Sequence, residues 1–208
     1  MREARDLGVL FSADLSFNTH IQSIVSSAYR TLGFILRWGR FFKNITTLKL
    51  LYCTLVRPKL EYCSIVWSPY FKCHQLLIER VQHKSLRMAA YRLGNPMSIT
   101  CHDYCSILDR LKLLSLEGRR LTFDLTFIFK LLNHTIDCPD LLERICFNIP
   151  TRELKQYSIF HIGYHRTLYN ANSCVNRLII SASNFSDRVD FFGGSVSTFK
   201  QKLFRLLL

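Results

Sequence analysis

The sequence predicts a mainly α-helical protein that opens with one short strand. About half of the 208 residues are hydrophobic, and 16 of them are Phe, which is enough apolar material to bury a sizeable core. Gly and Pro, with 8 and 5 residues, are too scarce for a turn-rich β-sandwich. Apolar residues recur at spacings of three and four through most of the chain, as they do on one face of an amphipathic helix.

The first elements are a strand and a long helix. Residues 7–11 (LGVLF) predict a short strand, which alone would be an orphan edge. The helix that follows is expected to be capped by Asn18 or Thr19. Arg30 and Arg37 fall on the face opposite its apolar residues. The predicted inward residues are Ile21, Ile24, Val25, Ala28, Leu32, Ile35 and Leu36.

Two further helices follow before the sequence changes character. The second is predicted to begin near Thr46 or Thr47 and to kink or restart at Pro58, where a backbone donor is missing. The third covers residues 71–92 and ends before the turn sequence GNP at 94–96. The predicted inward residues are Leu48, Leu51, Tyr52 and Leu55 in the second helix, and Leu77, Ile78, Val81 and Met88 in the third.

The second half of the chain predicts more helices after a seam that we place near residues 94–100. A helix that begins after Ser115 has apolar residues on several faces, which indicates a buried position. The other predictions are a short helix at 101–114, a helical turn near 138–145, an irregular or weakly β segment at 146–169, and two closing helices, the last one capped by Ser195 or Ser197.

The charge predicts a polyanionic partner. The net charge is +13, and residues 18–93 hold 12 basic residues against two acidic ones. Such an excess attracts nucleic acid or an anionic membrane surface. The basic residues are spread over several helices instead of one amphipathic helix, so we favour RNA, DNA or an RNA–DNA hybrid and expect no membrane partner.

The third helix carries the clearest candidate binding surface. Arg80, Lys84, Arg87 and Tyr91 recur at spacings of four, three and four, which aligns three cations and an aromatic ring on one face. Cations bind phosphates with release of counterions, and an aromatic ring can stack on a base. An ordinary solvated helix face has the same pattern. Together with the other basic residues of this segment, the stripe favours nucleic-acid binding over a solvated helix face. These residues are Arg30, Arg37, Arg40, Lys43, Lys49, Arg57 and Lys59.

Other chemistry has little support in the sequence. The eight Cys are scattered and no signal peptide is recognisable, so we expect free thiols and an intracellular protein, nuclear or cytoplasmic and not secreted. The CHDYC segment at 101–105 lacks the second ligand pair of a zinc site. No nucleophile elbow, phosphate loop or glycine-rich dinucleotide turn is present. We therefore assign no catalytic residue, metal ligand or cofactor to this chain.

An ordered set of segments resembles the C-terminal part of reverse transcriptases from non-LTR retrotransposons of the jockey-like group. The segments are LGVLFSADLSFNTHI, LKLLYCTLVRPKLEYCSIVWSPY, IERVQHKSLRMAAYRL, RLKLLSLEGRRLTFDLTFIFKLLN and FHIGYHRTLYNANSCVNRLI. The resemblance implies a palm-remnant strand at residues 1–17, a thumb-like basic helical bundle at 18–94, and a C-terminal helical extension at 95–208. The thumb of that family grips the template–primer duplex.

The resemblance also implies what is missing. The family is an RNA-directed DNA polymerase that uses magnesium at a pair of carboxylates. No position here matches that pair, so we expect a truncated fragment that is catalytically inactive alone. Asp14, in the polymerase-like stretch FSADLSF, follows the LGV strand and is predicted to mark a turn. Two alternatives remain open, namely a helical protein-interaction module and a non-functional pseudogene product that does not fold stably.

Overall fold

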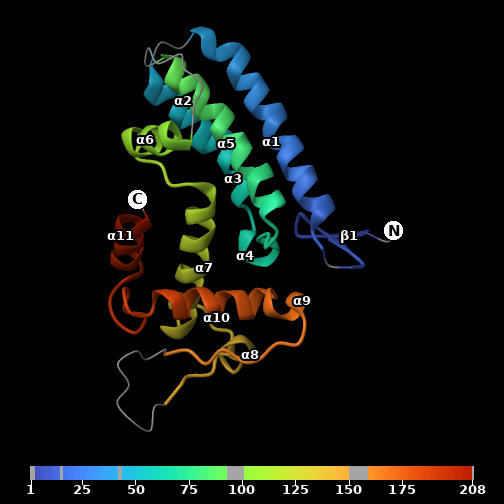
Figure 1. The fold of residues 1–208 in the computed structure, drawn as a ribbon, viewed down its shortest axis with the longest axis vertical. Helices are drawn as coiled ribbons and strands as arrows, with labels where there is room; N and C mark the ends of the chain where they lie inside the picture. The colour runs from blue at the N-terminus through green and yellow to red at the C-terminus, as the bar shows by residue number, and fades with distance from the viewer. Residues whose placement is uncertain (1–2, 15, 42–43, 93–100, 150–158, 208) are drawn as a thin grey trace. The chain divides into compact units, whose positions relative to one another are not determined.

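The computed structural model confirms the predicted fold class. It describes residues 3–14, 16–41, 44–92, 101–149 and 159–207, which form mostly helices after a small antiparallel sheet (Figure 1). The elements are β1 (Glu3–Asp6), β2 (Val9–Ser12), α1 (Asn18–Trp38), the 3₁₀ turn η1 (Gly39–Phe41), α2 (Ile45–Leu51), the π-helical turn η2 (Tyr52–Val56), α3 (Arg57–Glu61), α4 (Ser64–Trp67), α5 (Lys72–Arg92), α6 (Cys101–Leu111), α7 (Leu116–Leu132), α8 (Pro139–Leu142), α9 (Leu168–Ala171), α10 (Cys174–Phe185) and α11 (Val196–Leu207).

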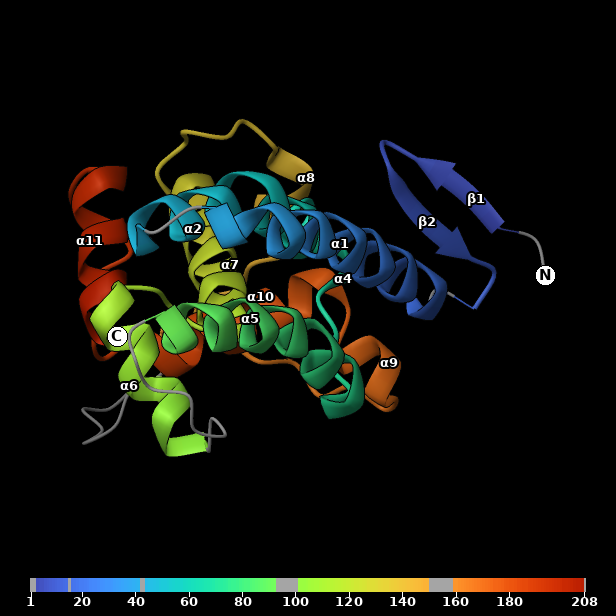
Figure 2. The same ribbon diagram turned by 90° about the horizontal axis from the view of Figure 1, so that it is seen from above.

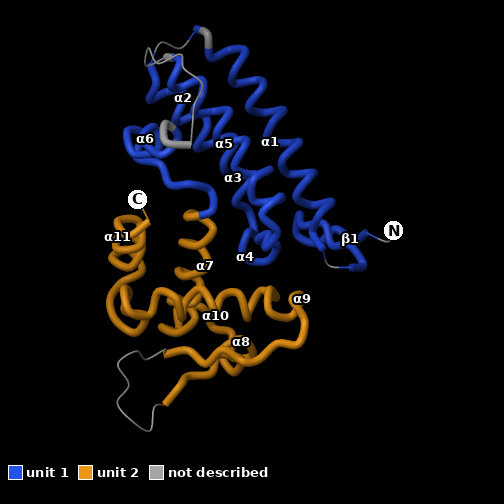
Figure 3. Tube along the Cα trace, viewed as in Figure 1, with its two compact units in different colours: residues 1–117, 208 blue, residues 118–207 orange. Residues whose placement is uncertain are grey.

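The chain forms two compact units (Figure 3). Unit 1 comprises residues 1–117 with 208, and unit 2 comprises residues 118–207. Helix α7 begins in unit 1 and continues into unit 2. The seam that the sequence predicts near 94–100 lies outside the described residues.

The N-terminal strand is not an orphan. β1 pairs antiparallel with β2, with Asp6 opposite Val9, and the tight turn between them consists of Leu7 and Gly8. Both turn residues have positive φ, 43° and 88°, as a two-residue hairpin turn requires. The prediction of a lone strand was wrong because β1 (EARD) is charged and exposed, so no apolar alternation marks it. In Figure 2 the hairpin lies beside the first turns of α1.

Asp14 marks a turn, as predicted. Its carboxylate accepts hydrogen bonds from the Ser12 hydroxyl and, at 3.3 Å, from the Ser16 backbone N–H. These donors lower the pKa of Asp14, the Ser12 hydroxyl most of all. The Asp14 carboxylate therefore stabilises the turn between β2 and α1.

Helix α1 has the predicted core face but a different start. Ile21, Val25, Ala28, Leu32 and Ile35 are buried. The predicted caps were wrong. The N-cap residue is Phe17, which has left-handed backbone and makes no side-chain hydrogen bond to the helix. Two further predicted inward residues, at positions 24 and 36, are half-buried.

The register changes between α2 and α3. Helix α2 begins at Ile45, close to the predicted start, and is capped by Asn44, whose Oδ1 accepts from the Thr46 N–H at 2.8 Å. The π-helical turn η2 then adds a residue to the turn. Consequently Leu55, predicted to point inward, is 44% exposed, whereas Val56 is fully buried. Pro58 lies in the first turn of α3, where its missing N–H is tolerated.

A buried polar network joins η2, α5 and α6 inside unit 1. Gln82 is 1% exposed, and its Oε1 accepts from the Tyr52 hydroxyl at 2.7 Å. Its Nε2 donates to the Tyr104 hydroxyl at 3.1 Å and to the Leu114 carbonyl at 3.0 Å. The Tyr104 hydroxyl in turn donates to Glu79. Ile78 and Val81, as predicted, are buried beside this network, while the predicted inward residues at 77 and 88 are half-buried.

Unit 2 has a core of its own. Phe129 of α7 stacks on Phe199 of α11, with ring centroids 4.2 Å apart. Phe160 is fully buried and pairs through an isolated bridge with Phe147, which is the weak β character predicted for 146–169. Ser195 caps α11, since its hydroxyl accepts from the Thr198 N–H at 3.2 Å.

Candidate nucleic-acid interface

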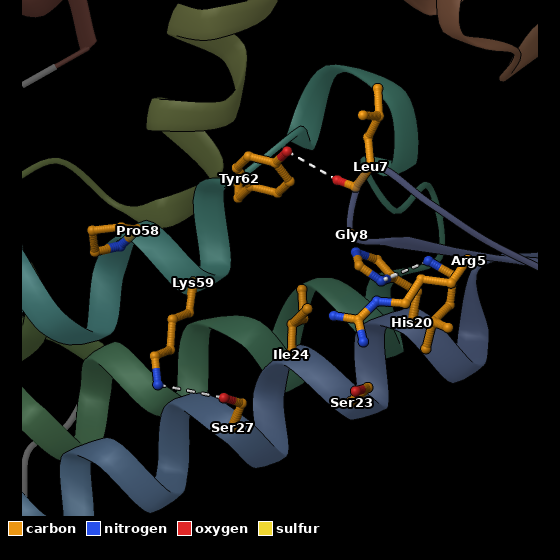
Figure 4. Close-up of a pocket in the computed structure, with 11 residues that line it drawn as sticks. Arg5, Leu7, Gly8, His20, Ser23, Ile24, Ser27, Pro58, Lys59 and Tyr62 are labelled. Carbon is orange, nitrogen blue, oxygen red and sulfur yellow. Dashed lines mark hydrogen bonds between the residues drawn. The ribbon is translucent and has the colours of Figure 1, made fainter.

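A groove on unit 1 lies between the hairpin, α1 and α3 (Figure 4). We call it the α1–α3 groove, and its volume is about 540 Å³. The groove is basic, because Arg5 and Lys59 are among its lining residues and none of the described lining residues is acidic. The lining residues that matter for its chemistry are Arg5, His20, Ser23, Ser27, Lys59 and Tyr62.

Lys59 is held across the groove in a defined position. Its Nζ reaches from α3 to α1, where it donates to the Thr31 hydroxyl at 2.6 Å and to the Ser27 hydroxyl at 3.4 Å. On the hairpin side, the Tyr62 hydroxyl donates to the Leu7 carbonyl at 2.9 Å. The hydroxyl partners carry no negative charge, so the Lys59 ammonium keeps its attraction for an anion such as a phosphate.

His20 binds the backbone of the hairpin and adds no positive charge to the groove. It is 3% exposed, and its Nδ1 accepts from the Leu10 N–H at 3.3 Å. Burial, with a smaller contribution from Arg5, lowers the pKa of His20, so the ring is neutral near pH 7. Its buried Nε2 has no hydrogen-bond partner, and its ring meets the edge of Trp67 with centroids 5.3 Å apart.

The predicted cations on α1 and α5 lie at the surface of unit 1. Arg30 and Arg37 are exposed on α1, on the side away from its buried face. Arg80, Lys84, Arg87 and Tyr91 are exposed along α5, as the spacing predicted. Helices α1 and α5 pack side by side (Figure 2), and the Lys84 ammonium lies 5.4 Å from the centre of the Tyr29 ring of α1.

Two predicted cations have internal partners. Lys49 is half-buried and its Nζ donates to the Leu111 carbonyl, beside a hollow of about 340 Å³ that Arg110 and Lys112 also line. Arg57 pairs with Glu61 at 3.6 Å. Lys49 and Arg57 are therefore less accessible to a long anionic ligand. The side chain of Arg40 and all of Lys43 lie outside the described residues.

The sequence analysis missed three exposed aromatic rings. Phe34 and Trp38 are each 55% exposed and Phe41 is 77% exposed. Their ring centroids are 6.3 Å and 6.1 Å apart in succession. The signal was present in their spacing of four and three, which repeats on the helix face opposite the apolar residues.

In the described part of the chain, no three His, Cys, Asp or Glu side chains are grouped so that they could hold a metal ion. Among the described helices, none combines the length and apolarity needed to cross a bilayer.

Three comparisons with known proteins give no relative. No family model, no curated protein and no solved structure matches the chain.

Proposed function

We propose that this chain is a truncated C-terminal fragment (end of the palm, thumb and downstream region) of a jockey-like non-LTR retrotransposon reverse transcriptase and that it binds RNA, DNA or their hybrid through the phosphates. The order of the five sequence segments supports the family. The binding partner follows from charge, because phosphate contacts supply sequence-independent affinity for nucleic acid.

The binding proposal is supported by the charge distribution of residues 18–93, where the described cations of α1 and α5 face solvent while the two acidic residues have internal partners. The two acidic residues of the segment 18–93 are Glu61 and Glu79. Glu61 pairs with Arg57, and Glu79 accepts from the Tyr104 hydroxyl and the Leu116 N–H. Both acids thus have internal partners, whereas the cations of α1 and α5 are exposed and can attract a phosphate backbone.

We also propose that these residues do not catalyse DNA synthesis by themselves. No two acidic residues are adjacent anywhere in the sequence, so the carboxylate pair that would hold two magnesium ions has no counterpart. Primer extension with a hybrid template–primer, magnesium and deoxynucleoside triphosphates should yield no product. Extension by the purified chain would contradict this part of the proposal.

Binding is tested by titrating a labelled RNA–DNA hybrid at several salt concentrations. We expect affinity to fall steeply with salt, and the double variant Arg80→Gln/Arg87→Gln to reduce the slope of log K against log salt by about 0.9 for each phosphate that is no longer neutralised. The matched control is Lys200→Gln/Lys202→Gln, which removes the same charge from exposed positions of α11 in unit 2. Affinity that does not depend on salt, or an equal effect of both double variants, would contradict the proposal.

A further inference from the structure

The three exposed aromatic rings form one row, which we call the aromatic row. Phe34 and Trp38 lie on α1, and Phe41 ends η1. The buried residues of α1, such as Leu32 and Ile35, lie on the opposite side of the helix. Core packing therefore does not explain why aromatic side chains occupy this solvent face.

Cations accompany the row along the same face. Arg30 lies one helical turn before Phe34, and Arg37 follows Phe34 by three residues, so both share its side of the helix. Both arginines are exposed. Aromatic rings beside guanidinium groups supply the two contacts that a nucleic-acid strand needs, a stacking surface for bases and a charge for phosphates.

The same face leads into the α1–α3 groove. Ser23 and Ser27, which line the groove, continue the solvent side of α1 toward its N-terminus. Lys59 binds the Ser27 and Thr31 hydroxyls next to them. A strand lying along α1 would thus meet cations at Lys59 and Arg30 before it reaches the rings.

The width of the apolar surface favours a strand over a bilayer. A helix that lies in a membrane interface presents a broad apolar face with cations at its borders. Here the apolar part is a single row, and the neighbouring turn of the same face carries Ser27, Arg30 and Thr31. Bases in a duplex are already stacked on one another, so exposed aromatic side chains stack more readily on unpaired bases.

We propose that the aromatic row is a stacking platform for the bases of single-stranded RNA or DNA, with Arg30 and Arg37 binding the neighbouring phosphates. This proposal rests on the proposed nucleic-acid function and narrows it, because it assigns unpaired strands to one helix face. The exposed cations of α5 remain available to a duplex.

Trp38 provides a direct readout. The protein has two Trp, and Trp67 is 1% exposed, so a bound base reaches only Trp38. Titration of the full chain with oligo-dT at low salt should quench the fluorescence in a saturable way. Phe34→Ala should weaken this binding about tenfold, as expected for the loss of one base stack. Trp38→Ala should do the same when binding is followed by anisotropy of labelled oligo-dT.

The control is Phe192→Ala, which removes an equally exposed Phe, at 55%, from unit 2 and should leave oligo-dT binding unchanged. Circular dichroism of each variant checks that the helices persist. Hybrid-duplex binding with no quenching by oligo-dT would overturn the aromatic-row proposal and leave the proposed function intact. Loss of binding to both ligands would overturn both. A blue shift of Trp38 with phosphatidylserine vesicles, without quenching by oligo-dT, would assign the row to membranes and overturn it.

Discussion

Asp124 shows at the residue scale how burial can outweigh an ion pair. Its carboxylate is 4% exposed and lies 3.4 Å from the Arg177 Nε. Burial raises the pKa of Asp124 from 3.8 to about 6, although Arg177 and Arg120 act in the opposite direction. This side chain, which interrupts the apolar sequence of α7, is therefore the titratable group of unit 2 with the clearest consequence for stability.

The raised pKa predicts a pH dependence of stability. Because the folded protein holds the Asp124 proton more tightly than the unfolded chain, this contribution to stability is complete below pH 3.8 and is lost as the pH rises through about 6. The loss is about 3 kcal/mol. Urea unfolding of wild type and Asp124→Asn at pH 4 and pH 7.5 measures it. Between these two pH values the wild type should lose about 2.4 kcal/mol relative to Asp124→Asn, because part of the loss already occurs below pH 4. Parallel pH profiles would contradict the assignment.

At the element scale, the hairpin turn has an unusual sequence for its geometry. A two-residue turn with positive φ at both positions prefers Asn-Gly, because Asn tolerates left-handed backbone better than most residues. Here Leu7 occupies the first position at φ 43° and is 81% exposed. The Tyr62 hydroxyl binds the carbonyl of Leu7, so the turn is held to α3 through the backbone and not through the leucine side chain.

Leu7→Asn is therefore predicted to stabilise the protein. Relief of the left-handed strain and removal of an exposed apolar side chain should raise the free energy of unfolding by about 1 kcal/mol. Leu7→Ala is the matched comparison, since it removes the same side chain but keeps the strain. Thermal unfolding compares the stability of the two variants. If Leu7→Asn is no more stable than Leu7→Ala, the result contradicts the left-handed geometry of the turn.

At the scale of the whole molecule, each compact unit has a buried polar cluster with partners inside that unit. Gln82 links Tyr52, Tyr104 and Leu114 inside unit 1. Asp124 and its arginine partner lie inside unit 2. Changes in separate clusters add, whereas changes within one network do not.

Gln82→Leu and Asp124→Asn should consequently be additive. Gln82→Leu leaves a buried hydroxyl and a buried carbonyl without partners, which should cost about 3 kcal/mol. The double variant should equal the sum of the single variants to within about 0.5 kcal/mol in urea unfolding at pH 7.5. Gln201→Leu, at an exposed position of α11, is the control and should change stability by less than about 0.5 kcal/mol. A coupling energy above about 1 kcal/mol would show that the clusters communicate.

Local patterns in the sequence determined the helical class, the extent of α5, the buried face of α1 and the exposed stripe from Arg80 to Tyr91. Such features follow from periodicity, which depends only on neighbouring residues. The tertiary structure alone decided the pairing of β1 with β2, the inward turn of Val56 in place of Leu55, and the burial of Gln82. Each of these depends on a partner distant in the sequence or on an added residue in a helical turn. It also decided which aromatic rings stay exposed, because a ring is apolar in either position and only packing determines whether it reaches the core.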